Sequence, residues 1–315
     1  ALAAVPLARS AVADGAEPSL NGHVGYYLVD QGLPHLEAAT GYRKPLGEAV
    51  HRGLLRHPNL VFGGGVFAGT AAALAAPFWL AGPAALTAWP LVLLLALIPA
   101  ADLAISAVNQ IVTAWLPPRT LPKLDLHGKE GIPAQFRTAV VVPTLFDSVE
   151  AVQEALANLE VQFLANRGAH IHFAILSDFV DAPSETLEGD TAIVEAGVQG
   201  VRALNARYAS GTGDAFYFFH RPRLWNPRQG VFMGWERKRG KLAEFNRFLR
   251  GGGEHAFSVI VGAVAPLRQV RYVITLDADT VLPPNAAPDL IGALAHPLNR
   301  AVYDEASARV VRGYG

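Results

Sequence analysis

The chain has 315 residues, of which 51% are hydrophobic and only 17% are charged, and its formal net charge is −1. This balance excludes a disordered chain, which has few apolar residues and many charges, and it excludes nucleic acid as a partner, because phosphate binding relies on massed Lys and Arg. The chain has no cysteine, which excludes disulfides, cysteine zinc ligands and thiol nucleophiles. The apolar share exceeds the needs of one soluble domain and predicts a membrane segment.

A long uncharged stretch runs from Leu60 to Ala101, without Asp, Glu, Lys or Arg. Because a helix crosses a bilayer with about 20 apolar residues, this stretch is long enough for two helices. Its turn signals, Gly82-Pro83 and Trp89-Pro90, predict transmembrane helices over about 60–82 and 87–115. A helical hairpin buried in a soluble core is the less favoured alternative, because such a core rarely needs so many uncharged residues.

Basic residues flank the two predicted helices on both sides, whereas the turn between them carries no charge. These cations are Arg43, Lys44, Arg52 and Arg56 before the pair, and Arg119, Lys123 and Lys129 after it. The positive-inside tendency predicts that both flanks are cytoplasmic, so residues 1–59 are expected to form an N-terminal cytoplasmic segment. Asp102, within the second helix, is expected to face other helices or water, because a carboxylate is costly in lipid.

The region after the membrane helices alternates between strand and helix patterns. Residues 117–137 are predicted to be an interfacial linker, because Pro117, Pro118 and Pro122 prevent the second span from continuing as a helix. Apolar, β-branched runs predict strands at 138–143, 170–176, 215–220 and 270–276, and apolar spacing predicts helices at 148–164, 186–210 and 239–250. This order predicts an α/β domain with a mostly parallel sheet over residues 138–315.

Three carboxylates follow predicted strands. Asp178 ends the second strand, and Asp277 and Asp279 come directly after the fourth. Ligands of such sheets collect at the carboxyl ends of the strands, and two carboxylates spaced in this way can bind Mg²⁺ together with substrate phosphates. An isolated Asp-x-Asp is more often a solvated turn, but its place after a buried strand and downstream of Asp178 favours a metal site.

A second motif combines four cations with the start of a predicted helix. In the run Gly234-Trp-Glu-Arg-Lys-Arg-Gly-Lys-Leu242, cations precede or open the helix. A helix N-terminus with nearby Lys and Arg suits a diphosphate. The competing interpretation is an amphipathic helix with a solvated basic end, which the internal glycine makes less favourable.

Together these motifs resemble membrane glycosyltransferases of the family-2-like class, which have a GT-A fold. Longer runs resemble, more specifically, the glycosyltransferase domain of bacterial cyclic β-1,2-glucan synthases, over roughly residues 20–315. These runs are Gly234 to Leu242, Tyr272-Val-Ile-Thr-Leu-Asp-Ala-Asp-Thr280, Ala295-His-Pro-Leu-Asn-Arg300 and Arg312-Gly-Tyr-Gly315. The resemblance implies a Rossmann-like GT-A domain attached to transmembrane helices in the bacterial inner membrane, with the catalytic domain in the cytoplasm.

The resemblance also implies a reaction and roles for five residues. It implies glucose transfer from UDP-glucose to a β-1,2-glucan that grows on the protein itself and is then cyclised. By this resemblance, Asp178 is the uridine-side carboxylate, and Asp277 and Asp279 hold Mg²⁺ or Mn²⁺ with the diphosphate. Lys238 and Lys241 are expected to lie near the nucleotide.

The acceptor half of such a site has no match in the sequence. Forming a β link from UDP-α-glucose inverts the sugar and needs a base to deprotonate the acceptor hydroxyl. Asp289 is too close to the metal motif, Asp304-Glu305 lacks a supporting context, and no Gln-x-x-Arg-Trp acceptor signature is present. The base is therefore expected beyond Gly315, as is the phosphorylase-like domain that these synthases carry.

Several alternatives remain open. The chain could serve a linear polysaccharide synthase of the cellulose-synthase-like class, or a non-catalytic membrane scaffold. Trp225 and the aromatic run 216–220 could stack on sugar rings, although a buried aromatic strand is the favoured interpretation of that run. His170 and His172 resemble a metal-binding pair, but no third ligand is visible.

Overall fold

A computed structural model describes residues 2–13, 20–81, 89–116, 118, 120–128, 131–209 and 213–314. The chain divides into two compact units between Leu121 and Pro122, which is inside the predicted linker. The predicted turn at Gly82-Pro83 and the cations Arg119 and Lys129 lie outside the described residues.

The N-terminal unit begins with short helices around a small core. Its helices are α1 (Ala4–Ala13), α2 (Val24–Val29), α3 (Leu33–Thr40) and α4 (Leu46–Arg56). Ala4, Ala8 and Tyr27 are buried between α1 and α2. An ion pair links α3 to α4, because the Glu37 carboxylate of α3 lies 2.6 Å from Arg52 of α4.

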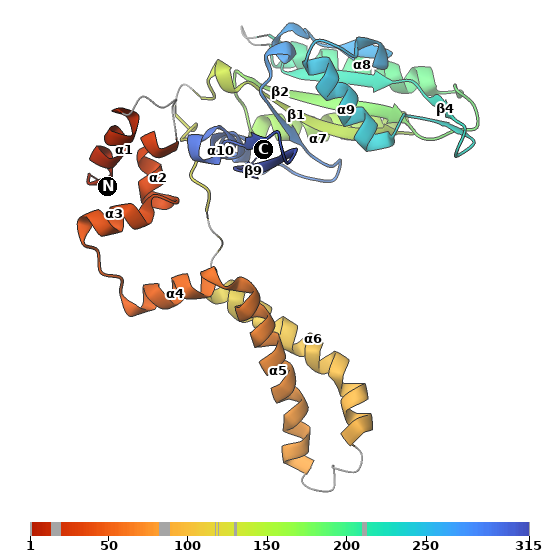
Figure 1. Cartoon of the computed structure of the whole chain (residues 1–315). Helices are drawn as coiled ribbons and strands as arrows, with labels where there is room; N and C mark the ends of the chain where they lie inside the picture. Colours follow the sequence, from red (N-terminus) through yellow and green to blue (C-terminus); the bar gives the residue numbers. More distant parts are fainter. Residues whose placement is uncertain are drawn as a thin grey trace. The chain divides into compact units, whose positions relative to one another are not determined.

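Two long apolar helices, α5 (Pro58–Ala81) and α6 (Trp89–Trp115), form a hairpin in the same unit (Figure 1). They correspond to the predicted spans, and both are long and apolar enough to cross a membrane. Their contact uses small residues, since a Cβ added at Gly69 would lie only 3.0 Å from Ala104 Cβ. Small residues on one helix allow the close backbone approach on which helix association in lipid depends.

Polar residues of α6 lie on the side opposite α5. Ala104 and Val108 meet the α5 glycines, whereas Asp102, Ser106 and Thr113 fall about half a helical turn away and are exposed. Asp102 therefore does not pack against α5, its partner in the described hairpin.

The C-terminal unit is built on a five-stranded sheet with strand order β6-β3-β2-β1-β7. Its strands are β1 (Thr138–Phe146), β2 (Ile171–Phe179), β3 (Phe216–Arg221), β6 (Val259–Val261) and β7 (Tyr272–Thr275). Only β6, at one edge, runs antiparallel to its neighbour. The predicted mixed α/β unit with a mostly parallel sheet is confirmed, and the GT-A name for it stays a prediction.

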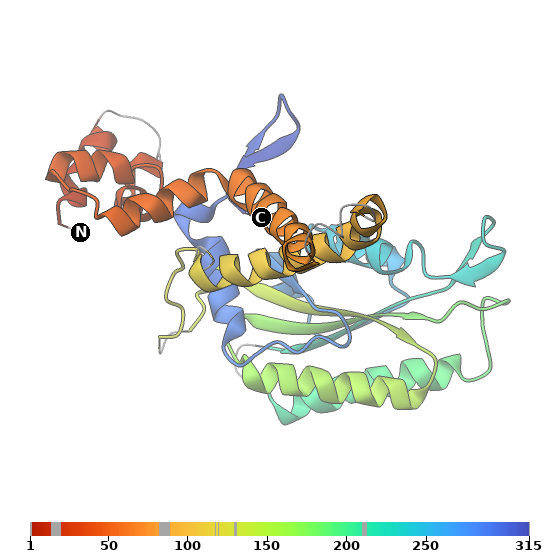
Figure 2. The ribbon, with the colours of Figure 1, turned by 90° about the horizontal axis from the view of Figure 1, so that it is seen from below.

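Helices cover both faces of this sheet (Figure 2). Alternate residues of β1 point to opposite faces: Val140 and Val142 pack into the cluster with α7 (Val149–Ala165) and α8 (Asp190–Arg207). Ala139 and Val141 pack with α9 (Arg237–Leu249) on the other face. Both faces are thus buried, which explains why the strands are continuous apolar runs.

Strand β1 extends further than predicted, because Pro143 lies within it and not at its end. The Val141 carbonyl accepts from Leu276 N, so Val141 and Pro143 both direct their backbone groups toward β7. The pairing with β7 ends at Val141, so the N–H that proline lacks is not needed there. Strand β2 likewise continues past its predicted end, and Asp178 is inside the strand.

Several elements were not predicted. They are the hairpin of β4 (Leu224–Asn226) and β5 (Val231–Met233), strand β6, helix α10 (Ala286–Ala295), and the hairpin of β8 (Val302–Asp304) and β9 (Arg309–Arg312). Part of the predicted linker also packs against α10, where Leu124 N donates to the Gly292 carbonyl at 3.1 Å. A Cβ at Gly292 would lie 2.4 Å from the Leu124 carbonyl oxygen, so glycine permits this contact.

Candidate functional site

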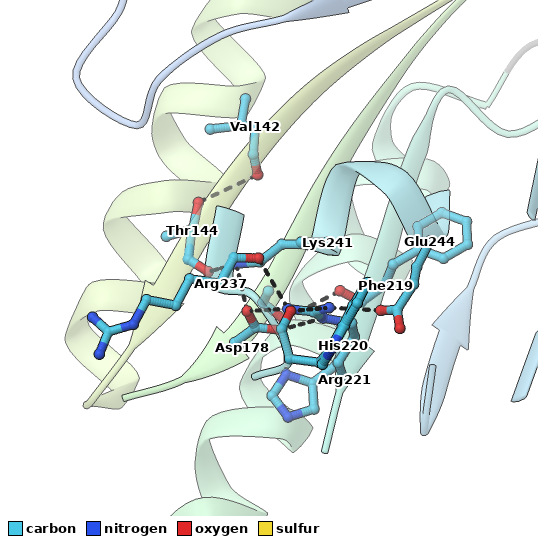
Figure 3. A network of polar contacts seen from close by, with 11 residues as sticks. Val142, Thr144, Asp178, Phe219, His220, Arg221, Arg237, Lys241 and Glu244 are labelled. Atoms are coloured by element: carbon cyan, nitrogen blue, oxygen red, sulfur yellow. Dashed lines mark hydrogen bonds and ion pairs between the residues drawn. The ribbon is translucent and has the colours of Figure 1, made fainter. Parts of the chain in front are cut away.

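Asp178 lies in a buried ion-pair network (Figure 3). It is opposite Arg221 in the register of β2 and β3. Arg221 donates from Nε to Oδ1 and from Nη2 to Oδ2, each at 2.7 Å, and from Nη1 to Glu244 of α9 at 2.6 Å. Asp178 and Arg221 are 1% and 2% exposed. Bidentate pairing of this kind fixes the orientation of both side chains.

Lys241 of α9 joins the same network from the other side. Its Nζ lies 3.2 Å from Asp178 Oδ2 and donates to the Thr144 carbonyl of β1 at 2.5 Å. Burial lowers the pKa of Lys241 to about 8, and the Asp178 carboxylate opposes that shift. One lysine therefore ties α9 to the carboxyl ends of β1 and β2.

The loop before α9 depends on this network and on two glycines. The carbonyls of Trp235 and Arg237 accept from Arg221 at 3.0 and 3.2 Å. A Cβ at Gly234 would lie 2.5 Å from Asp178 Cγ, and one at Gly240 would lie 2.0 Å from the Trp235 carbonyl oxygen. The glycines of the Gly234 to Leu242 motif are thus sterically required.

Backbone strain is concentrated in the same loop. Glu236 and Arg237 have φ of 50° and 48°, in the left-handed region that favours glycine. Such conformations cost about 1–3 kcal/mol each and persist only where the surroundings fix them. The hydrogen bonds from Arg221 supply that constraint.

His220 extends the network within β3. Its Nδ1 lies 2.8 Å from Ser177 Oγ, and its Nε2 is buried without a hydrogen-bond partner among the described residues. Burial lowers the pKa of His220 to about 4, against the opposing effect of Asp178. A neutral imidazole here avoids a further buried positive charge beside Arg221 and Lys241.

The Asp-x-Asp motif is exposed, and its first carboxylate contacts α9. Asp277 and Asp279 follow β7, which is next to β1, and both are exposed. Lys238 forms an ion pair with Asp277, and the two side chains are 54% and 59% exposed. Helix α9 therefore contacts Asp277 through Lys238 and Asp178 through Lys241.

The structure thus separates the five predicted site residues into two groups. Asp277, Asp279 and Lys238 are open to a ligand. Asp178 and Lys241 are not, because their charged groups are buried and already paired. The contacts of Asp178 and Lys241 hold the loop and the helix that carry Lys238, and the nucleotide roles expected for these two residues stay predictions.

The acidic motif fits a hard divalent cation only with help from a ligand. No cluster of three or more His, Asp or Glu in the described part of the chain could hold a metal ion by itself. Two exposed carboxylates nevertheless suit Mg²⁺, which keeps waters and bridges one or two protein carboxylates to substrate phosphates. The donor set of Asp277 and Asp279 is of that kind.

Other candidate residues have structural partners. His172 is buried between Arg137 Nη1, at 2.9 Å, and the Asp214 carbonyl, at 3.2 Å, and burial lowers its pKa to about 4. Asp289 accepts from Lys123 at 2.6 Å and lies 2.9 Å from His127 Nε2. These contacts explain the positions of the His172 and Asp289 side chains, and neither position needs a metal or a catalytic role to explain it.

Sequence reasoning missed Arg221 and Glu244, which complete the network around Asp178. Arg221 is the last residue of the aromatic strand β3 and belongs to no motif of the sequence; only the register of β2 and β3 places it opposite Asp178. The aromatic run is buried, as favoured, with Phe216 to Phe219 all 0% exposed. Trp225 differs, because it lies on the β4–β5 hairpin and is 53% exposed.

Comparison with known proteins gives one decisive result. No protein-family model matches the chain. The chain is 36% identical, over 299 residues, to the cyclic β-(1,2)-glucan synthase NdvB of Rhizobium meliloti (strain 1021), and the match covers 94% of the chain. The chain is a relative of this synthase.

The resemblance predicted from the motifs is therefore confirmed. The matched region includes the Asp-x-Asp and lysine motifs, since it leaves out so little of the chain. The chain spans 10% of the length of this curated relative.

Proposed function

We propose that this chain contributes the donor-binding part of a membrane glycosyltransferase that transfers glucose from UDP-glucose to a β-1,2-glucan. The relationship to a cyclic β-(1,2)-glucan synthase supports the product class. The observation that carries the donor site is the double attachment of α9, to Asp277 by Lys238 and to Asp178 by Lys241. This observation supports the proposal because Lys238 and Asp277 meet just after the carboxyl end of β7, at the edge of a parallel sheet where such folds bind ligands.

Asp277 and Asp279 would hold Mg²⁺ or Mn²⁺ in this proposal. When bound, the ion would offset the negative charge that develops on the diphosphate leaving group. Lys238 pairs with Asp277 at an exposed position. Because the pair is exposed, the Lys238 ammonium group can also reach a phosphate oxygen bound beside Asp277.

Asp178 and Lys241 act as positioning residues in this proposal. Their buried pairing with Arg221 fixes the strained loop at Glu236 and Arg237, from which Lys238 continues into α9. Positioning matters for transfer because a misplacement of about 1 Å can cost on the order of a hundredfold in rate.

The remaining features of the proposal come from the family. Glucose transfer with inversion needs a base on the acceptor side. We do not assign this role to Asp289, because its carboxylate is paired with Lys123 and His127. We place the transfer at the cytoplasmic face of the bacterial inner membrane, with α5 and α6 in the bilayer. The glucan grows on the protein and is cyclised, and a phosphorylase-like domain is a further partner.

The proposal is tested with labelled UDP-glucose and membranes that contain the full-length protein. Wild type is expected to incorporate label into protein-bound glucan and then into a cyclic β-1,2 product, and Asp279→Asn is expected to abolish incorporation. Glu188→Gln, at another exposed carboxylate before α8, is the matched control and should keep full activity.

Three outcomes would contradict the proposal in different ways. A linear product with another linkage would favour a linear polysaccharide synthase. Incorporation that survives in Asp279→Asn would remove the metal motif from the reaction. Failure of wild type to incorporate label or to bind UDP with metal would favour a membrane scaffold.

A further inference from the structure

A concave, partly aromatic surface lies beside the proposed donor site. The β4–β5 hairpin and the loop before α9 enclose a cavity of about 530 Å³, within the size range of small-molecule sites. Two tryptophans line it, Trp225 of the hairpin and Trp235 of the loop, and they are 53% and 46% exposed. Exposed tryptophans in a concavity are unusual, because large aromatic side chains gain stability from burial.

Both tryptophans are held in place, although part of each remains exposed. The Trp225 ring packs on Phe232 of the paired strand, with centroids 5.1 Å apart. Trp235 packs on α9, where a Cβ at Gly240 would lie 2.7 Å from its Cε3 atom. Aromatic groups fixed in this way need little further ordering when a ligand stacks on them, so the entropic cost of binding is low.

The rest of the lining is mixed, because Leu224, Pro227 and Met233 are apolar and the other residues are polar or charged. Arg228, Gln229 and Glu236 line the cavity, and the Asn226 side chain shapes the hairpin turn by accepting from Arg228 N at 3.0 Å. Pyranose rings present apolar C–H faces and a rim of hydroxyl groups. Aromatic surfaces together with amide and charged side chains complement both parts, as orienting polar groups do in other small-molecule sites.

The cavity is connected to the donor site by the main chain. Its wall includes Trp235, Glu236 and Arg237, the residue immediately after these is Lys238, and Arg221 binds two of their carbonyls. The left-handed conformations of Glu236 and Arg237 belong to this wall, and strained backbone clusters at ligand sites.

We propose that this cavity is a saccharide subsite, which binds glucose units of the growing β-glucan through Trp225 and Trp235. The proposal rests on the function proposed above for the identity of the saccharide. A hairpin that inserts into the bilayer would be the other use of exposed tryptophans, but its apolar residues would project outward, whereas these two line a concavity that also holds Arg228, Glu236 and Arg237. The subsite would hold the chain near the donor while each new unit is added.

Titration of the detergent-solubilised full chain with a linear β-1,2-linked glucose pentasaccharide tests the subsite. Trp225→Ala is expected to weaken binding by about tenfold or more, the loss typical of a truncated aromatic anchor. Trp225→Phe keeps an aromatic surface and should stay within about threefold of wild type. Tyr303→Ala, at an exposed aromatic of the β8–β9 hairpin, is the matched control and should bind as wild type.

A second variant separates recognition from folding. Gln229 is an exposed residue of the cavity, and Gln229→Ala is expected to weaken pentasaccharide binding measurably while thermal unfolding is unchanged. Absence of pentasaccharide binding by wild type, or equal affinity in wild type, Trp225→Ala and Gln229→Ala, would overturn the subsite.

Failure of the subsite and failure of the donor site can be told apart by titrating UDP with Mg²⁺ in the same samples. Metal-dependent UDP binding without pentasaccharide binding would overturn the subsite alone. Pentasaccharide binding that depends on Trp225, without UDP binding, would support the subsite and overturn the proposed donor site.

Discussion

Two lysines of α9, three residues apart, have opposite surroundings. Lys241 is 2% exposed and contacts Asp178 and the Thr144 carbonyl, whereas Lys238 is about half-exposed and contacts Asp277. The inward group (Asp178, Arg221, Lys241) is fully paired within the protein. The outward group (Lys238, Asp277, Asp279) is open to solvent.

This difference shows how one short motif can serve structure and binding together. A buried charge must be paired to be tolerated, and the buried Asp178 carboxylate is covered by the arginine and the lysine that pair with it. An exposed ion pair contributes little to stability, roughly 0–1 kcal/mol, so Lys238 and Asp277 can exchange partners at small cost. The inward group should therefore control folding, and the outward group should control ligand binding.

The largest expected effect is on the inward group. Asp178→Asn leaves the buried charges of Arg221 and Lys241 without their shared carboxylate, and breaking a buried pair costs about 3–5 kcal/mol. Chemical denaturation should show a loss of that size in the free energy of unfolding. If Asp178→Asn unfolds with the same free energy as wild type and loses only UDP binding, Asp178 contacts the ligand and does not serve folding.

Acid should weaken the same buried region. The pKa values of His172 and His220 fall from 6.5 to about 4 on burial, so below pH 6.5 the unfolded chain binds protons that the folded chain does not. The stabilisation is complete above pH 6.5 and is lost as the pH falls toward 4, by roughly 2–3 kcal/mol for each histidine.

The measurement is the free energy of unfolding of wild type and His172→Gln at pH 7 and pH 4.5. The variant removes one titrating group, so its loss of stability between the two values should be smaller than that of wild type. Equal losses in the two proteins would show that His172 does not titrate in this way.

The glycines of the lysine motif should come next. Gly234→Ala would push a Cβ to 2.5 Å from Asp178 Cγ, and such overpacking typically costs about 1–3 kcal/mol. Gly128→Ala is the control, because nothing lies within 4 Å of a Cβ there. Thermal unfolding that shifts equally in both variants would show that Gly234 is not required for packing.

The smallest expected change in stability is at the outward group. Lys238→Met should alter the free energy of unfolding by no more than about 0.5 kcal/mol, because it removes an exposed pair. The same variant should weaken UDP binding in the presence of Mg²⁺. A large loss of stability, with UDP affinity retained, would reverse the roles assigned to the two lysines.

The sequence was sufficient for features that depend on local pattern. Helices α5 and α6 follow from the apolar run, and the mostly parallel sheet of β1, β2, β3 and β7 follows from strand–helix alternation. The resemblance to cyclic β-1,2-glucan synthases followed from long motifs and is confirmed by the comparison.

Features that depend on register and burial were beyond the sequence. The sequence predicted that the first strand ends at Pro143, because proline is rare inside strands. The strand continues because its pairing with β7 ends at Val141, so the N–H that Pro143 lacks is not needed. The placement of Asp178 inside its strand, opposite Arg221, is set by the pairing of β2 with β3. The motif that predicted a nucleotide site could not show that Lys241 points inward and Lys238 outward.

The most direct test of the account is titration of UDP into wild type and Asp279→Asn, with Mg²⁺ and then with a chelator. We predict that wild type binds UDP only with the metal, and that Asp279→Asn loses this binding while its thermal unfolding stays that of wild type. Metal-independent UDP binding, or undiminished binding in Asp279→Asn, would contradict the assignment of the outward carboxylates to the donor site.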